Sequence, residues 1–258
     1  MRNVDLRYNK GWKKTTGVNA REVRNRKQTA HERKHNMGNV KLTWLGHSCF
    51  ALEKEDYRII FDPYLDGSAP GYAPLRETAD RVLCSHEHND HGGKDHGAGG
   101  VELTKNAAEK ECPWEITEIH SFHDGNQGRD RGENIIRVLD DGEFRIAHMG
   151  DLGCEMTEEQ KEQLRFLDVM MVPIGGYFTM EPEDVKKLVD ELQPTVVVPM
   201  HYRFGKYGYP AIAEAERYTK LCEDVIEYDG PTLELPEDGS PQTAMLRYLG
   251  SGIDVSRE

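Results

Sequence analysis

The stretch Ser85-His86-Glu87-His88-Asn89-Asp90-His91-Gly92-Gly93 places three histidines and an aspartate within six positions. It follows a short apolar run, residues 81–85, that has the composition of a β-strand. Imidazole nitrogens and carboxylate oxygens are the ligands that zinc and similar divalent metals prefer. In a tight turn after a strand, His86 and His88 can point to one position, and Asp90 and His91 to a neighbouring one. The stretch therefore predicts a site for one or two divalent metal ions.

Strand-like runs come first along the remaining chain, and strands that alternate with helical patterns follow. Strands are predicted over residues 40–45, 50–53, 57–61, 81–85, 115–119, 134–139, 144–148, 168–173 and 195–200, with two more near Leu233 and Met245. Helices are predicted from Thr157, along the face Val185, Leu188, Val189 and Leu192, and over 211–222. This order predicts one α/β domain of layered sheets covered by helices.

Residues 1–38 differ in charge from the rest of the chain. They contain eleven Lys/Arg and three Asp/Glu, a net of +8, which leaves −21 for the remainder of a chain whose total is −13. They show no sustained period, so we expect a disordered basic extension before a domain over residues 39–258. Two other interpretations stay open: an extension upstream of a true start at Met37, or a regulatory or oligomer-forming arm.

Composition excludes several classes of protein. The five cysteines are scattered and form no C-x-x-C pair, which argues against a disulfide framework or a cysteine zinc cluster. No apolar run is long enough to span a membrane, and no signal peptide is recognisable, so we expect a cytoplasmic protein. The strongly acidic body argues against general binding to nucleic acid.

The pattern His86-x-His88-x-Asp90-His91 resembles the signature of the metallo-β-lactamase superfamily. Later residues fit the same resemblance, which covers residues 40 to about 248: His123 and His201 follow predicted strands, and Asp151 lies in a Gly-Asp step. The resemblance implies a four-layer αββα sandwich. The details look most like the ascorbate-6-phosphate lactonase-like hydrolases, on the segments Gly46-His47-Ser48, Gly128-Arg129-Asp130-Arg131-Gly132 and Pro199-Met200-His201-Tyr202.

Carried over residue by residue, the resemblance implies a two-metal site. His86, His88 and His123 would hold one ion. Asp90, His91 and His201 would hold a second, and Asp151 would bridge the two. Zinc suits these ligands best, and Mn²⁺, Fe²⁺ or Ni²⁺ can use them too. A metal-bound hydroxide would attack the substrate, with Asp90, Asp151 and His47 as the catalytic side chains.

Several neighbouring residues have less certain roles. His47 can be a substrate-binding group, an extra ligand or a packed loop histidine, and His120 competes with His123 for the third ligand position. Arg131, Tyr202 and Arg203 lie in loops beside predicted ligands, where cations can bind an anionic substrate. Loop Arg and Lys residues are also commonly plain surface charges.

The predicted activity is hydrolysis of a small ester, lactone or phosphodiester. The substrate can be anionic, because the loops beside the predicted ligands carry cationic side chains. Alternatives on the same fold are a nuclease or phosphodiesterase acting on nucleic acid, and an iron-dependent redox enzyme. The short segment after His201 and the acidic body count against the nuclease. A non-catalytic metal-binding protein is a further alternative, which the complete ligand set disfavours. The resemblance also implies a homo-oligomer.

Overall fold

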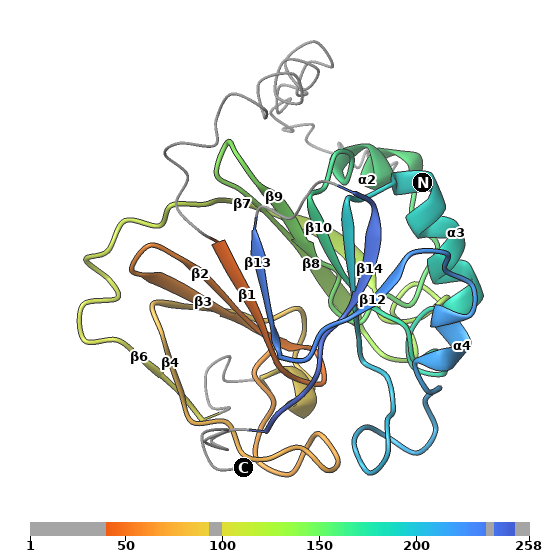
Figure 1. Ribbon diagram of the computed structural model, residues 1–258, viewed down its shortest axis with the longest axis horizontal. Helices are drawn as coiled ribbons and strands as arrows, with labels where there is room; N and C mark the ends of the chain where they lie inside the picture. Colours follow the sequence, from red (N-terminus) through yellow and green to blue (C-terminus); the bar gives the residue numbers. More distant parts are fainter. Residues whose placement is uncertain (1–39, 93–99, 236–239, 251–258) are drawn as a thin grey trace, which may run out of the picture. The chain divides into compact units, whose positions relative to one another are not determined.

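Two β-sheets that face each other form the centre of the computed structural model, which describes residues 40–92, 100–235 and 240–250 (Figure 1). One sheet has five strands in the order β13-β1-β2-β3-β5, and the other has seven in the order β12-β14-β11-β10-β9-β8-β7. The sheets pack through residues such as Phe61 of β3 and His148 of β9, whose rings stack with centroids 5.1 Å apart. The described residues belong to one compact unit, residues 38–258.

The five-stranded sheet is built from short strands whose side chains alternate between its two faces. Its strands are β1 (Val40–Gly46), β2 (Cys49–Lys54), β3 (Tyr57–Phe61), β5 (Arg81–Leu83) and β13 (Thr232–Leu235). Its pairings are antiparallel except that of β3 with β5. The histidine-rich stretch follows β5 directly along the chain.

The seven-stranded sheet is mainly parallel at its centre. Its strands are β7 (Glu115–Phe122), β8 (Glu133–Asp140), β9 (Arg145–His148), β10 (Val169–Pro173), β11 (Val196–Met200), β12 (Val225–Glu227) and β14 (Gln242–Met245). Every residue of β10 and β11 is buried, as expected of parallel strands covered on both faces. The apolar, β-branched composition of these two segments therefore matches their position.

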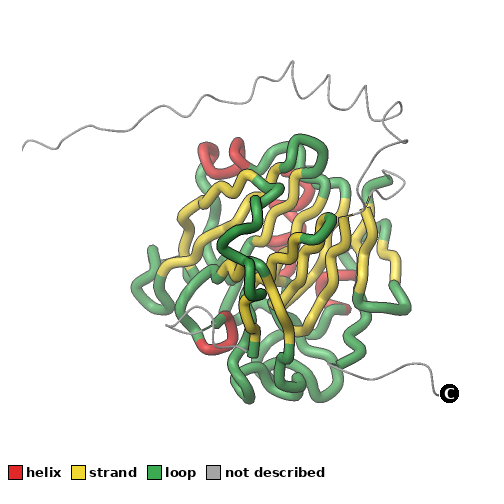
Figure 2. Tube along the Cα trace, turned by 90° about the vertical axis from the view of Figure 1, so that its left-hand side faces the viewer, coloured by secondary structure: helices red, strands yellow, loops and turns green. Residues whose placement is uncertain are grey.

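Three short α-helices, α2 (Glu158–Gln163), α3 (Pro182–Leu192) and α4 (Glu216–Thr219), lie beside the seven-stranded sheet (Figure 1). The Thr157 side chain and Gln160 form the predicted capping box at the start of α2. Helix α3 buries Val185, Leu188 and Leu192. The turned view shows how few of the described residues are helical (Figure 2).

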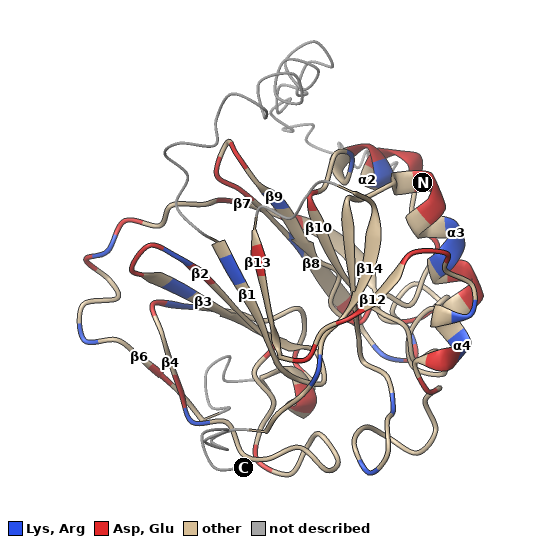
Figure 3. Cartoon of the chain, viewed as in Figure 1, with Lys and Arg blue, Asp and Glu red and all other residues tan. Residues whose placement is uncertain are grey.

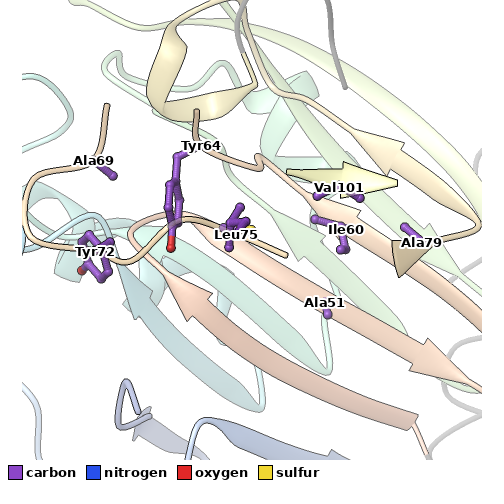
Figure 4. Packing of buried hydrophobic residues seen from close by; sticks show 9 residues of the cluster. Ala51, Ile60, Tyr64, Ala69, Tyr72, Leu75, Ala79 and Val101 are labelled. Carbon is purple, nitrogen blue, oxygen red and sulfur yellow. The ribbon is translucent and has the colours of Figure 1, made fainter. Parts of the chain in front are cut away.

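A layer of loops and two short strands covers the other face of the five-stranded sheet. There β4 (Glu77–Ala79) pairs with β6 (Val101–Leu103). Ala51 and Ile60 of the sheet pack in one buried cluster with Tyr64 and Tyr72, which belong to the loop after β3 (Figure 4). The Tyr64 hydroxyl donates to the backbone oxygens of Leu45 and Ala73, at 3.2 and 2.9 Å. The facing sheets confirm the predicted α/β sandwich.

The predicted helix over 211–222 is wrong except for its four residues in α4. The backbone before α4 is irregular, because the Ala213 N–H donates to the Gly175 oxygen and the Arg203 N–H donates to the Ala213 oxygen. These bonds to other segments replace the bonds within a helix. Strands β4, β6 and β12 were not predicted. The expectation for residues 1–38 lies outside the described residues.

Acidic side chains are prominent on the helices that cover the seven-stranded sheet (Figure 3). Helix α2 carries Glu158, Glu159 and Glu162, and the first turn of α3 carries Glu183 and Asp184. Among the described residues, no helix has the length and apolarity needed to cross a bilayer.

Candidate metal centre

The predicted ligands all follow the ends of strands, and the fold brings them together. The histidine-rich stretch follows β5, while His123, Asp151 and His201 follow β7, β9 and β11. Their ligand atoms form three overlapping groups, and within each group these atoms lie within 4.8 Å of one another. The groups are His86, His88 and His123; His47, Asp90, His91 and His201; and His86, His91 and Asp151.

The first group consists of imidazoles alone. His86 and His123 are buried, whereas His88 is exposed. The His86 Nε2 lies 3.0 Å from the His88 Nδ1, and the His123 Nδ1 is 3.1 Å from the Phe178 oxygen. With its Nδ1 bonded to this acceptor, His123 directs its Nε2 toward the cluster.

The second group is more enclosed and contains a carboxylate. His47 and His91 are fully buried, and the His47 Nε2 lies 3.2 Å from the Asp90 Oδ2. The rings of His47 and His201 are 4.3 Å apart between centroids. Both of these histidines have positive φ angles, 52° and 51°, which non-glycine residues rarely adopt. Such strain is typical of functional sites.

Asp151 joins the two groups. Its Oδ2 lies 3.1 Å from the Nε2 of His123 and 3.2 Å from that of both His91 and His201. Its Oδ1 is buried and has no hydrogen-bond partner among the described residues. One Asp151 oxygen therefore contacts imidazoles that belong to both groups.

Burial and neighbouring charges shift the pKa values of this cluster. Burial, followed by the charge of His201, lowers the pKa of His47 to about 4. Burial and His91 lower that of His86 to about 2. Burial opposes ionisation of Asp151, but His201 and His91 outweigh it and hold its pKa well below the usual range. At neutral pH, His47 and His86 are therefore neutral and Asp151 is charged, and these are the forms that bind metals.

His91 is the exception, because three carboxylates surround it. Burial lowers its pKa, but Asp151, Asp62 and Asp90 outweigh burial and raise the pKa well above the ordinary value. The His91 Nε2 is buried and has no hydrogen-bond partner within the described part of the chain, although carboxylate oxygens lie near it. A metal cation beside the His91 Nε2 would neutralise the same carboxylate charges that a proton on His91 neutralises. The donor set therefore fits a divalent metal.

Asp62 supports the cluster, and in the sequence nothing distinguishes it beyond its place after the predicted strand 57–61. It is fully buried, with φ 41°. Its carboxylate accepts from the Ser85 N–H at 2.6 Å and the Ser85 hydroxyl at 2.7 Å, and its Oδ2 lies 2.7 Å from the His91 Nδ1. A carboxylate behind a histidine fixes the tautomer and orientation of a metal ligand.

Asn134 fixes the turn that carries Asp151. Its side-chain NH₂ donates to the Met149 oxygen at 2.9 Å, and its Oδ1 accepts from the Asp151 N–H at 2.9 Å. Gly150 lies against the same amide, since a Cβ there would be 2.2 Å from the Asn134 Oδ1. The Gly-Asp step therefore needs glycine at this turn.

The predicted substrate-binding residues occupy different surroundings. Tyr202 is buried and stacks on Trp44 with ring centroids 5.6 Å apart, which places it in an aromatic cluster. Arg203 pairs with Glu214 at 2.7 Å. Arg131 lies over the Phe178 ring, with 5.4 Å from its guanidinium carbon to the ring centroid. His120 is exposed on β7 and lies outside the donor groups.

Comparison with known proteins agrees with this fold. The family model described as the β-lactamase superfamily domain matches residues 41–201. A UPF0173 metal-dependent hydrolase of Desulforamulus reducens is 33% identical over 196 residues, which cover 63% of this chain and 84% of that protein. One from Thermococcus onnurineus is 30% identical over 232 residues, covering 76% of this chain and 100% of the relative.

Solved structures show the same architecture. A metallo-β-lactamase superfamily protein of Thermotoga maritima superimposes with a TM-score of 0.60 at 29% identity, covering 80% of this chain and 98% of that one. A metallo hydrolase of Ignicoccus hospitalis has a TM-score of 0.53 at 20% identity, covering 83% and 97%, and shares the fold.

The facing sheets and their edge of histidines and aspartates define a protein of the metallo-β-lactamase fold. The chain belongs to the metallo-β-lactamase superfamily and, within it, to the UPF0173 family of metal-dependent hydrolases.

Proposed function

We propose that this protein hydrolyses a small ester, lactone or phosphodiester with the help of two divalent metal ions, zinc in the first place. The observation that carries the proposal is the position of Asp151, whose Oδ2 lies within 3.2 Å of imidazole nitrogens from three separate segments. His86, His88 and His123 would hold one ion, and Asp90, His91 and His201 the other. Bound metals would supply Lewis acidity and an activated water.

The residues around the ligands orient them and keep bulk water away. His47 is neutral at neutral pH, and its ring lies between His201 and the Asp90 carboxylate. We propose that His47 orients the Asp90 carboxylate. Asp62 orients His91, because its carboxylate lies 2.7 Å from the His91 Nδ1. Because these supporting groups are buried, the ligand atoms need little rearrangement when a metal binds.

We assign recognition of an anionic substrate group to Arg131. Its backbone N–H donates to the Asp124 carboxylate, which also accepts from the N–H groups of Asn126, Gly128 and Asp130. The loop is therefore built around one buried side chain. The Arg131 guanidinium packs on Phe178, whose oxygen contacts His123. The resemblance to ascorbate-6-phosphate lactonase-like enzymes favours the same choice.

A small molecule is the preferred substrate, because the acidic body disfavours a nucleic acid polyanion. Zinc is preferred for the His-rich donor set, and the Thermotoga maritima relative is named as a candidate Zn-dependent hydrolase. A cytoplasmic location and a homo-oligomeric state stay predictions.

Elemental analysis of the purified protein, paired with hydrolysis of a lactone and a generic phosphodiester, tests this function. We expect about two equivalents of metal per chain, hydrolysis that a chelator abolishes, and recovery when zinc is added back. Arg131→Gln should raise KM for an anionic substrate more than for its neutral analogue. Bound iron without hydrolysis would favour the redox alternative. Absence of bound metal even after reconstitution would refute the proposal.

A further inference from the structure

Tyr209 lies at the edge of the cluster and is not a member of any donor group. Its ring centroid is 5.8 Å from that of His47 and 5.7 Å from that of Phe178. Its hydroxyl donates to the Ser68 oxygen at 2.7 Å. The Ser68 hydroxyl in turn donates to the oxygen of Asn89, the residue before Asp90, at 2.8 Å. Through Ser68, this phenol is tied to the metal-binding stretch.

Two loops meet closely to hold Tyr209 in this place. The Gly208 N–H donates to the Pro70 oxygen at 2.9 Å. Gly71 has φ +84°, and a Cβ there would lie 2.3 Å from the Lys206 oxygen, so only glycine allows this approach. The loop that contains Ser68 and Gly71 is fixed by the buried cluster around Tyr64 (Figure 4). The phenol therefore has a defined position.

The donor groups themselves offer lone pairs and few protons. Metal ligands present deprotonated nitrogen and oxygen atoms to the ion, so they cannot also protonate a departing group. Hydrolysis releases an oxygen that gains negative charge as its bond breaks, and a hydrogen-bond donor stabilises that charge. A phenol is protonated at neutral pH, and Tyr209 is half-buried beside the cluster.

We propose that Tyr209 is a further catalytic residue, which donates its hydroxyl proton to the leaving oxygen of the substrate. This inference rests on the proposed hydrolytic function. The oxygen of the attacking water forms the new bond to the carbonyl carbon, and the bond from that carbon to the leaving oxygen breaks. The leaving oxygen replaces the Ser68 oxygen as the acceptor and takes the phenol proton, and a proton released from the water restores the phenol.

Tyr209→Phe tests this role, because it removes one hydroxyl and keeps the ring contacts with His47 and Phe178. The matched control is Tyr177→Phe, since Tyr177 also contacts Phe178, at 4.7 Å between centroids, but is 61% exposed. The zinc-loaded proteins are assayed on acetate esters from 4-nitrophenyl to simple alkyl. We expect Tyr209→Phe to lower kcat/KM about 100-fold for alkyl esters and only about 3-fold for 4-nitrophenyl acetate.

The dependence on the leaving group separates proton donation from a structural effect. Metal content should match that of the unchanged protein, and the unfolding temperature of Tyr209→Phe should fall by only a few degrees, because one hydrogen bond to Ser68 is lost. Tyr177→Phe should keep activity on every ester. An equal loss on all esters, or no loss on any, would overturn the role of Tyr209. If the unchanged zinc-loaded protein cleaves none of the esters, lactones or phosphodiesters, the proposed function itself fails, and this inference fails with it.

Discussion

The two donor groups at the site differ in enclosure and in charge. One combines three imidazoles, of which His88 is exposed. The other combines three buried histidines with Asp90, and the Asp62 carboxylate lies behind His91. A carboxylate adds charge to a site, and a buried supporting group orients its ligand. We therefore expect the second group to bind its metal more tightly, and the first to exchange metal more readily.

Asp151→Ala should have the largest effect, because Asp151 contacts histidines that belong to both groups. We expect the loss of both metals and a decrease of about 1000-fold or more in kcat/KM for hydrolysis. Metal content by elemental analysis and turnover after incubation with zinc measure the two effects. Retention of one full equivalent would show that the groups are independent, against a bridging role.

His88→Ala should damage only the exposed group. We expect about one equivalent of metal to remain, with a decrease in activity of about 100-fold, because the second group keeps all of its donors. The metal stoichiometry after dialysis measures this difference. Loss of both equivalents would contradict the comparison, and full activity with full metal content would remove His88 from the site.

Asp62→Asn tests whether the Asp62 carboxylate strengthens metal binding by the second, buried donor group. The amide keeps the size of the side chain and loses its charge, so we expect metal affinity to fall about 10- to 100-fold. Competition with a chromogenic chelator gives the affinity. Asp66→Asn is the matched control, because Asp66 pairs with Arg76 on the surface. Equal affinities of the two variants would show that Asp62 has no role in binding.

The stability of the metal-free protein should fall in mild acid. His47 titrates near pH 6.5 when unfolded and near pH 4 when folded, so the unfolded chain binds more protons between these values. The unfolding temperature should therefore decrease by several degrees from about pH 6.5 to pH 4, and His47→Asn should reduce this slope. His91 has a raised pKa and contributes in the opposite sense, with stability lost as the pH rises above 6.5. A flat profile for both proteins would contradict the assignment.

The strands and the ligand stretch could be predicted because local patterns determine them. Alternating and β-branched segments such as Tyr57–Phe61 and Val196–Met200 form strands close to the predicted bounds. Local patterns could not show that most of the predicted helix over 211–222 is absent and that only α4 forms. There the backbone bonds of Ala213 go to Gly175 and Arg203, and no local pattern shows such distant partners.

The seven residues predicted as ligands lie together in the structure because each follows a strand, and strand ends meet at one edge of the sheets. Supporting residues are harder to find. Asp62 is visible only as an aspartate before a proline, and Tyr209 owes its position to a contact with Ser68, 141 residues earlier. Tyr202 follows a ligand directly, yet it points into the aromatic cluster with Trp44.

All five cysteines are free, so no disulfide joins distant parts of this chain. The proposed ligands run from His86 to His201, and ions bound there would close loops of up to about 115 residues. Such a cross-link restricts the unfolded chain in the way that a disulfide does, and the binding energy of a metal adds to the free energy of folding. The metal supply of the cell would then govern how long the protein survives proteolysis as well as how fast it works.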